Sequence, residues 1–309
     1  MNNGVSVIVC CYNSIIRLPQ TLKYLSLQCV PSEIHWEIII VDNNSINHET
    51  FELFFRFCAK DERVSVIQYN HPFNFSAIIN YAVSKCSGSV LVLLNNDTEV
   101  INEEWLEELV SHTLRKDVGA VGAKLLYPND LIQHAGIFLY EGHPGIHIYQ
   151  KHNSKRPGYF NKLNLIQQYT AVTAACLAVR KKVFESVGGF DEENLSIAYN
   201  DVDFCLKLRE KGLYNVWTPF SQLYHHEFLS RGDDFNETNI ERFKKERRFM
   251  LNKWKKFIDN DPYFNPNLSP EPGPVTYANP PKALYSWREK DNYREQYVSD
   301  TQYESIFEK

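Results

Sequence analysis

Strand and helix patterns alternate four times within about the first 120 residues, and this alternation constrains the fold more than any other feature of the chain. Four largely apolar, β-branched runs are separated by stretches in which apolar residues recur at helical spacing; the runs cover 5–10, 36–42, 63–69 and 89–94. Such continuous runs are typical of strands that are buried on both faces of a parallel sheet. The sequence therefore predicts an α/β fold with a doubly wound, mostly parallel central sheet and flanking helices.

The second half of the chain carries weaker patterns. Residues 141–159 are rich in Gly, Pro and His, and we predict a loop there. A short strand and helix are predicted between 170 and 192, a helix over 200–212, and a strongly charged helix over 238–258. The segment 261–309 is rich in Pro, Asn and Tyr with little periodicity, which indicates an extended tail.

Composition excludes several classes of protein. The formal net charge of −5 argues against a nucleic-acid binder held by bulk charge. Seven cysteines, an odd number without a CxxC pair, indicate a reduced protein. The N-terminus lacks the basic start of a signal peptide, and no apolar run approaches the roughly 20 residues that span a bilayer. We therefore expect a cytoplasmic protein, either soluble or bound at the inner face of the cell membrane.

Polar side chains follow three of the predicted strands. They are Tyr12-Asn13, Asp42-Asn43-Asn44 and Asn95-Asn96-Asp97. Each group alone could close a turn or cap a helix, but ligands of doubly wound sheets bind beyond the carboxyl ends of the strands. Neither the dinucleotide fingerprint nor the P-loop motif is present, so a metal ion or basic residues would have to hold the phosphates of any nucleotide.

Two further groups carry chemistry later in the chain. The acids Asp201 and Asp203 lie in the first turn of a predicted helix, where the helix dipole favours any acid. A second group, His225-His226-Glu227, ends a predicted strand, and paired histidines in such a place are less often structural. Both groups are candidates for a site and each also has a structural interpretation.

With these motifs in order, the chain resembles family 2 glycosyltransferases with the GT-A fold, of the bacterial polysaccharide and O-antigen type that includes rhamnosyltransferases. The matching segments, within roughly 4–270, include "EIIIVDNNS", "LVLLNNDTEV", "YNDVDFCLKLREKG" and "LYHHEFLSRG". The resemblance implies a glycosyltransferase domain over 1–235, with a nucleotide-binding half, 1–127, and an acceptor half, 128–235. Residues 236–309 would then form a C-terminal helix and tail.

The resemblance implies a nucleotide-sugar donor and residues that contact it. The backbone near Tyr12 and Asn13 would lie against the nucleotide, and Asp42 would contact its base or ribose. The family's D-x-D position falls on Asn95-Asn96-Asp97, so that Asn95 and Asn96 would lie close to the donor diphosphate.

The resemblance also implies a cation and a base. Asp97 would hold a divalent cation, Mg²⁺ or Mn²⁺, on the diphosphate, and His225 would complete that metal site, with Glu227 and Arg231 close behind. Asp201 would be the general base of an inverting transfer. These roles suit the chemistry, because the leaving group needs a cation and the acceptor hydroxyl must lose a proton.

Two positions depart from the family pattern. Asn95 stands where an acid is usual, so metal binding should be weaker or should rely more on phosphate, water and His225. Asn200 replaces the glutamate that usually precedes the base, Asp201. We expect Asp203 to hydrogen-bond the local backbone or a basic side chain.

The leading hypothesis is therefore an inverting glycosyltransferase that acts in cell-surface polysaccharide synthesis on a saccharide or lipid-linked saccharide acceptor. A nucleotidyltransferase is a second hypothesis, but the glycine-rich basic loop it needs is missing near the N-terminus. A non-catalytic scaffold of a polysaccharide-synthesis complex is a third. Residues 238–309 could contact anionic lipid, although a helix that packs one apolar face on the domain explains the pattern better. The sequence does not decide whether the chain forms a homo-oligomer.

Overall fold

The computed structural model describes residues 4–26, 35–226, 239–269 and 276–278. The chain divides into two compact units, Met1–Phe264 and Asn265–Lys309. The described part of the second unit is a short antiparallel pair, β13 (Leu268–Ser269) and β14 (Thr276–Tyr277). All candidate site residues that the structure describes belong to the first unit.

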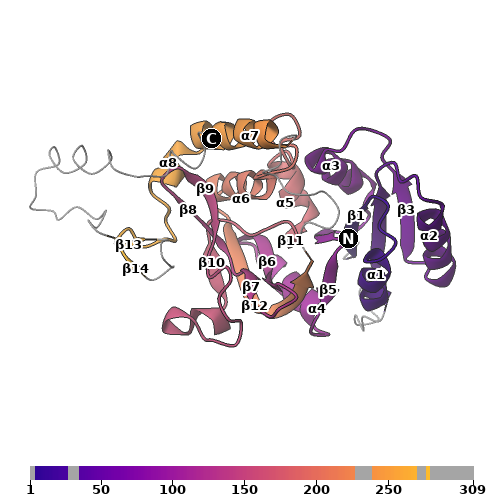
Figure 1. Ribbon diagram of the computed structural model, residues 1–309, viewed down its shortest axis with the longest axis horizontal. Coiled ribbons are helices and arrows are strands. Elements are labelled where there is room, and N and C mark those ends of the chain that lie inside the picture. The colour runs from indigo at the N-terminus through magenta and orange to yellow at the C-terminus, as the bar shows by residue number, and fades with distance from the viewer. Residues whose placement is uncertain (1–3, 27–34, 227–238, 270–275, 279–309) are drawn as a thin grey trace, which may run out of the picture. The chain divides into compact units, whose positions relative to one another are not determined.

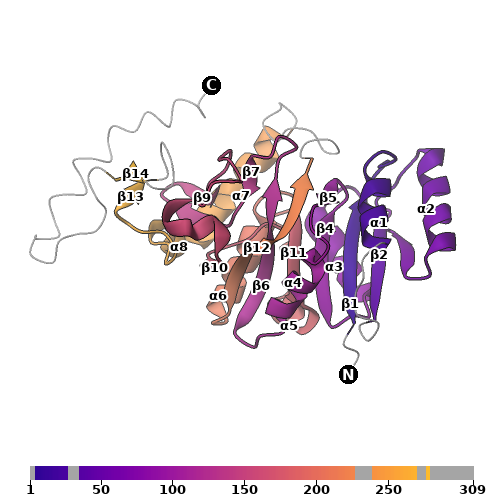
Figure 2. The ribbon, with the colours of Figure 1, turned by 90° about the horizontal axis from the view of Figure 1, so that it is seen from below.

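A mixed, mostly parallel sheet forms the centre of the first unit, and its strands run side by side in Figure 2. Four parallel strands appear where the sequence predicts them, in the order β3 (Val64–Gln68), β2 (Trp36–Asp42), β1 (Val5–Cys11) and β4 (Val90–Asn95). The sheet continues beyond β4 with β11 (Cys176–Arg180), β6 (Val118–Leu126), β12 (Tyr214–His225) and the edge strand β10 (Gln167–Tyr169). The predicted fold class is confirmed.

Helices cover both faces of this sheet. Figure 1 shows α3 (Phe75–Lys85), α5 (Lys181–Ser186) and α6 (Asn200–Glu210) along one face, and α1 (Leu18–Ser26) and α4 (Trp105–Thr113) along the other. Because alternate strand residues point to opposite faces, β1 is buried on both sides: Val7, Ile8 and Val9 are all fully buried. The remaining helix of this half, α2 (His48–Lys60), packs beside β3.

The orientation of β12 decides which strand ends lie at the same edge of the sheet. β12 runs parallel to β6, and β6 and β4 are each antiparallel to β11, so β12 and β4 end at the same edge of the sheet. The short strand β5 (Thr98–Val100), just after β4, turns back and pairs with the end of β12. The carboxyl ends of β1, β2, β4 and β12 therefore lie along one edge.

The prediction of a loop over 141–159 is partly wrong. A hairpin of β8 (Ile137–Tyr140) and β9 (His143–His147) reaches into this segment, and β7 (Ile132–His134) precedes it on the edge of β6. Gly142 has φ +71° at the tight turn of the hairpin, so the glycine marks a turn between strands. A 3₁₀ helix, η1, follows at Tyr159–Asn164.

The charged C-terminal helix is part of the first unit. It is broken at Trp254 into α7 (Ile240–Lys253) and α8 (Lys255–Asp259), and its buried side chains include Glu246 and Met250. Among the described residues, no helix is both long and apolar enough to cross a membrane. The domain boundary at residue 235 stays a prediction.

Asp203 joins α6 to this C-terminal helix. The carboxylate is fully buried and its Oδ1 accepts a hydrogen bond of 2.7 Å from Trp254 Nε1. The Lys253 ammonium lies 2.7 Å from the same oxygen, and Lys207 lies 3.5 Å from Oδ2. The expected basic partner of Asp203 is therefore present, supplied by two lysines, and the residue has a structural role.

Replacing Asp203 with Ala is expected to lower the free energy of unfolding by about 3 kcal/mol, because a buried charge pair loses one partner and the indole N–H loses its acceptor. Urea denaturation would measure the change. Asp259→Ala is the matched control, since its pair with Lys255 is exposed and should contribute less than about 1 kcal/mol. Equal losses in the two variants would contradict the structural role of Asp203.

Candidate functional site

One cavity lies at the edge of the sheet where the four strand ends meet. Its volume is about 670 Å³, and small-molecule sites commonly measure about 300–1,000 Å³. Its lining includes Cys10 to Tyr12 at the end of β1, Asn43 and Asn44 after β2, Asn95 to Asp97 at the end of β4, and His225 at the end of β12. The first turn of α6, including Asp201, closes another side.

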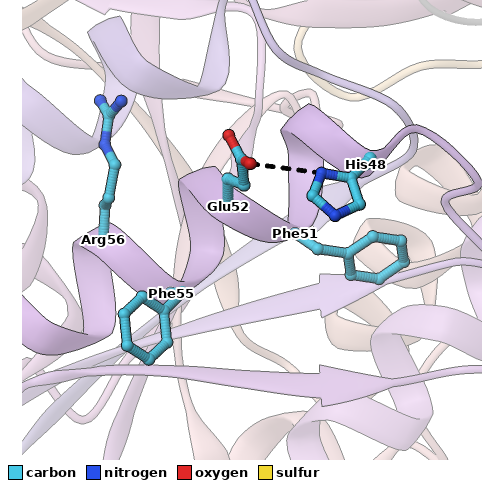
Figure 3. Close-up of a pocket in the computed structure, with 5 residues that line it drawn as sticks. All are labelled: His48, Phe51, Glu52, Phe55 and Arg56. Atoms are coloured by element: carbon cyan, nitrogen blue, oxygen red, sulfur yellow. Dashed lines mark ion pairs between the residues drawn. The ribbon is translucent and has the colours of Figure 1, made fainter.

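A second pocket lies apart from this edge, on the surface of α2. Figure 3 shows its five lining side chains, His48, Phe51, Glu52, Phe55 and Arg56, with the ion pair between His48 and Glu52. All five come from one helix, and none of them lines the cavity at the strand ends. We therefore place the candidate site in the larger cavity.

Asp97 and His225, which are far apart in the sequence, meet in this cavity. His225 pairs with Thr98 across β12 and β5, and the backbone N–H of His226 donates to Asp97 O at 3.0 Å. As a result, His225 Nε2 lies 3.2 Å from Asp97 Oδ1, with both side chains almost fully buried. The family resemblance assigns these two residues to one metal site. The structure brings them together, and their binding of a metal stays a prediction.

The geometry of this pair suits a cation. Gln133 Oε1 can only accept a hydrogen bond, so at 2.7 Å it receives the Nδ1–H of His225. The other ring nitrogen, Nε2, then lies 3.2 Å from Asp97 Oδ1, an oxygen with no hydrogen-bond partner within the part of the chain that the structure describes. When Nε2 carries no proton, its lone pair faces this oxygen. Two facing lone pairs repel unless a proton or a cation lies between them. Two neighbouring ligands of an octahedral cation, each about 2.1 Å away, would be about 3.0 Å apart.

The protein supplies few charged ligands for such a cation. No group of three or more His, Cys, Asp or Glu side chains that could hold a metal occurs among the described residues. The donor Nδ2 of Asn95, which stands in place of the usual acid, lies 3.1 Å from His225 Nε2, and Asn96 also lines the cavity. The remaining coordination positions would therefore fall to phosphate and water, as expected from Asn95 in the sequence.

The side of the cavity next to β1 and β2 has an aromatic wall. Asn43 Nδ2 donates to Tyr69 O at 2.9 Å and to His71 O at 2.8 Å, which holds the loop after β3 against the end of β2. His71 and Phe73 of that loop line the same cavity as the half-exposed Tyr12. Aromatic rings of this kind can stack on a nucleotide base.

The side chains of Asn13 and Asp42 are not part of the cavity lining. Asn13 Oδ1 accepts the backbone N–H groups of Ile46 and Asn47 at 2.9 and 3.0 Å, and Asp42 Oδ1 accepts that of Ser45 at 3.3 Å. Asp42 Oδ2 is buried and finds no hydrogen-bond partner in residues 4–26, 35–226, 239–269 and 276–278. Both residues shape the loop after β2, and their contact with a nucleotide stays a prediction.

Asp201 presents an oriented carboxylate to the cavity. Oδ1 accepts the backbone N–H of Val202 at 2.8 Å, and Oδ2 accepts that of Ala174 at 3.1 Å. These two bonds fix the plane of the group, and each oxygen keeps a further lone pair. Tyr199, just before α6, has φ +60°, so the backbone enters the helix in the left-handed region. The carboxylate can therefore accept a proton from a ligand in the cavity.

The C-terminal helix α7 contributes to the same cavity, which the sequence did not reveal. Glu246, almost fully buried, accepts hydrogen bonds from Ser196 Oγ at 2.8 Å and from the backbone N–H groups of Ile197 and Ala198 at 3.0 and 3.2 Å. Arg242 pairs with Glu246 and itself lines the cavity. The segment that leads into Asp201 is thus held by α7.

Other lining residues come from the region with weak sequence patterns. They include Gln133, Ile137, Gly145, His147 and Gln150. In the sequence, only the density of His and Gly in this region could have pointed to a site.

Glu227 and Arg231, which were expected behind His225, lie outside the described residues. The side chain of His226 pairs with Glu99 at 3.3 Å.

Comparison with known proteins identifies relatives of this chain. The chain is similar to an uncharacterized protein, y4gI, of Sinorhizobium fredii, with 42% identity over 246 residues. It is also similar to the O-antigen biosynthesis protein RfbC of Myxococcus xanthus, with 38% identity over 240 residues. These matches cover 80% and 76% of the chain but only 27% and 18% of the two relatives, so the chain corresponds to a part of each. An N-acetylglucosaminyl-diphospho-decaprenol L-rhamnosyltransferase of Mycobacterium tuberculosis is 36% identical over 63 residues, 20% of each chain.

Solved structures share the fold at low sequence identity. A mannosyltransferase, PcManGT from Pyrobaculum calidifontis, in complex with GDP-Man and Mn²⁺, superposes with a TM-score of 0.58 at 16% identity, over 82% of this chain and 64% of that one. GalNAc-T7 with UDP, GalNAc and Mn²⁺ gives 0.65 at 14% identity, over 82% and 49%. The profile of the family described as "Glycosyl transferase family 2" matches residues 6–188, more than half of the 309 residues. The chain belongs to glycosyl transferase family 2 and has the GT-A fold.

Proposed function

We propose that this chain transfers a sugar from a nucleotide-sugar donor to a saccharide or lipid-linked saccharide acceptor in cell-surface polysaccharide synthesis, with inversion at the anomeric carbon. One observation carries the proposal. A single cavity is lined both by the Asp97 and His225 pair and by the oriented carboxylate of Asp201. A metal-assisted transfer needs both groups in reach of one substrate.

The chemistry follows from these residues. The acceptor hydroxyl gives its proton to Asp201 as its oxygen bonds to the anomeric carbon. The bond from that carbon to the diphosphate breaks, and its electron pair leaves with the nucleoside diphosphate. Asp97 and His225 would hold a divalent cation, and such an ion supplies positive charge for the developing charge on the diphosphate oxygens. The aromatic wall at His71 and Phe73 would receive the base.

The relatives indicate the class of substrate. Their names include an O-antigen biosynthesis protein and a rhamnosyltransferase that acts on a lipid-linked diphosphate sugar, and two structural neighbours are complexes with a nucleotide or nucleotide sugar and Mn²⁺. These names support a nucleotide-sugar donor, a saccharide or lipid-linked acceptor, and Mn²⁺ or Mg²⁺ as the cation. The chain spans only 27% and 18% of the length of the first two relatives, so the full activities of those proteins are not assigned to it.

A thermal-shift screen of UDP-, GDP- and dTDP-sugars, with and without Mn²⁺, tests the donor and the cation together. At about 100 times its dissociation constant, a ligand that binds only the folded state adds roughly 2.7 kcal/mol of stability. We expect one nucleotide class to raise the melting temperature, and to do so more strongly with Mn²⁺. If no nucleotide or nucleotide sugar shifts the transition under either condition, the proposed donor site is wrong.

The setting of the enzyme is also part of the proposal. We place it in the cytoplasm, where nucleotide sugars are made, and at the inner face of the cell membrane when its acceptor is lipid-linked. Exposed basic side chains of α7, Lys244, Lys245 and Arg248, support a peripheral contact with anionic lipid through 238–309. The apolar side chains Met250 and Trp254 face the protein, so such a contact would be electrostatic.

A further inference from the structure

Gln133 lies next to the candidate cation site without belonging to any motif of the sequence. It is on β7, which pairs with β6, and its side chain is almost fully buried while it lines the cavity. Its Oε1 lies 2.7 Å from His225 Nδ1, and its Nε2 donates to the backbone oxygen of His225 at 3.4 Å. Both ends of one amide thus contact the same histidine.

This contact selects one form of the imidazole. A glutamine Oε1 has no proton to give, so the bond requires the proton of neutral His225 on Nδ1. In the ring form with a single proton, the lone pair then lies on Nε2, the nitrogen that lies 3.1 Å from the donor Nδ2 of Asn95 and 3.2 Å from Asp97 Oδ1. Without Gln133, the ring could rotate or carry its proton on Nε2, and a proton on Nε2 would block a metal ligand at that atom.

We propose that Gln133 is a positioning residue that holds His225 as the Nδ1–H tautomer and thereby prepares its Nε2 as a cation ligand. The inference rests on the proposed function, because it assigns the partner that fixes one ligand of the cation. A hydrogen-bond partner that orients a cation ligand affects metal affinity more where the protein supplies few ligands. Here Asn95 stands in place of one carboxylate ligand. Removing a hydrogen-bond partner of a metal-binding histidine typically costs about 10–100-fold in metal affinity.

Binding of Mn²⁺ alone to the full chain, followed by electron paramagnetic resonance, tests the inference without any sugar donor. Gln133→Leu, close in shape but unable to accept, should weaken Mn²⁺ binding about tenfold or more. Gln133→Glu keeps an acceptor for Nδ1–H and should restore most of the affinity. Gln222→Leu is the matched control, since Gln222 does not line the cavity and its Nε2 donates to Pro219 O at 2.9 Å.

A second readout reports the tautomer directly. In the metal-free wild type, ¹⁵N chemical shifts of the His225 ring should show the proton on Nδ1, and Gln133→Leu should shift the population toward the Nε2–H form. A purely structural role of Gln133 would change thermal stability without this shift. A wild-type ring protonated on Nε2 would overturn the inference even if the Leu variant failed to fold.

The two proposals fail in different ways. If His225→Ala binds Mn²⁺ as tightly as the wild type, the cation site of the proposed function is wrong. If His225→Ala loses Mn²⁺ but Gln133→Leu keeps wild-type affinity, the cation site stands and the role of Gln133 is wrong. Weaker Mn²⁺ binding in Gln133→Leu, recovered binding in Gln133→Glu and unchanged binding in Gln222→Leu would support both proposals.

Discussion

Replacing Asp201 with Asn is expected to slow sugar transfer by about 10²–10⁴-fold, which is the usual contribution of a general base. The amide keeps the size of the carboxylate and can still accept from the backbone N–H of Val202 or Ala174, but it cannot take a proton from the acceptor. Donor affinity should stay close to that of the wild type, because the base acts on the acceptor. Initial rates of nucleoside diphosphate release and calorimetric titration of the donor would separate the two effects.

Asp203→Asn is the matched control for this variant. Asp203 lies two residues further along α6, but it is fully buried, does not line the cavity, and keeps an acceptor for Trp254 Nε1 as Asn. Its transfer rate, measured on folded protein, should stay within a few-fold of the wild type. Normal turnover by Asp201→Asn would remove Asp201 from the reaction, whatever the control shows.

The second large effect is expected at Asp97. Asp97→Asn removes the only carboxylate of the Asn95-Asn96-Asp97 turn, and the charge on the leaving diphosphate then lacks its cation. Loss of one electrostatic stabiliser of a transition state commonly costs about 10²–10³ in rate. We therefore expect a loss of that size at saturating donor, together with a higher Mn²⁺ requirement, in rates measured over a series of Mn²⁺ concentrations.

Asp130→Asn provides the comparison for Asp97. Asp130 is exposed, accepts a hydrogen bond of 2.6 Å from Tyr224 Oη, and is not part of the cavity lining. Its rate and Mn²⁺ dependence should match those of the wild type. An Asp97→Asn enzyme with an unchanged Mn²⁺ dependence would show that the cation is held elsewhere or is not used.

Much of the fold could be predicted because local patterns decide it. The four strands from β1 to β4 are continuous apolar runs, and a run buried on both faces has few alternatives to a parallel sheet. The strand β9 was missed because Gly142 lies in the turn of the hairpin and Pro144 lies near the start of β9, and both residue types are typical of loops. The break of the C-terminal helix at Trp254 was missed as well, since no Gly or Pro marks it.

The candidate site was predictable only in part. Asp97, Asp201 and His225 stand at strand or helix ends in motifs that resemble a family, and the structure brings all three to one cavity. Gln133 and Glu246 were missed because their partners lie 92 and about 50 residues away, at His225 and in the segment 196–198. Contacts of that length depend on strand order and helix packing, which a single sequence does not contain.

The most direct test is a crystal structure of the full chain grown with Mn²⁺ and the nucleoside diphosphate selected by the thermal-shift screen, with anomalous data collected at the manganese edge. We predict one anomalous peak at coordination distance from both Asp97 and His225, with the diphosphate on the same ion and the base against the wall at His71 and Phe73. A nucleotide bound outside this cavity, or a manganese peak that touches neither Asp97 nor His225, would contradict the account.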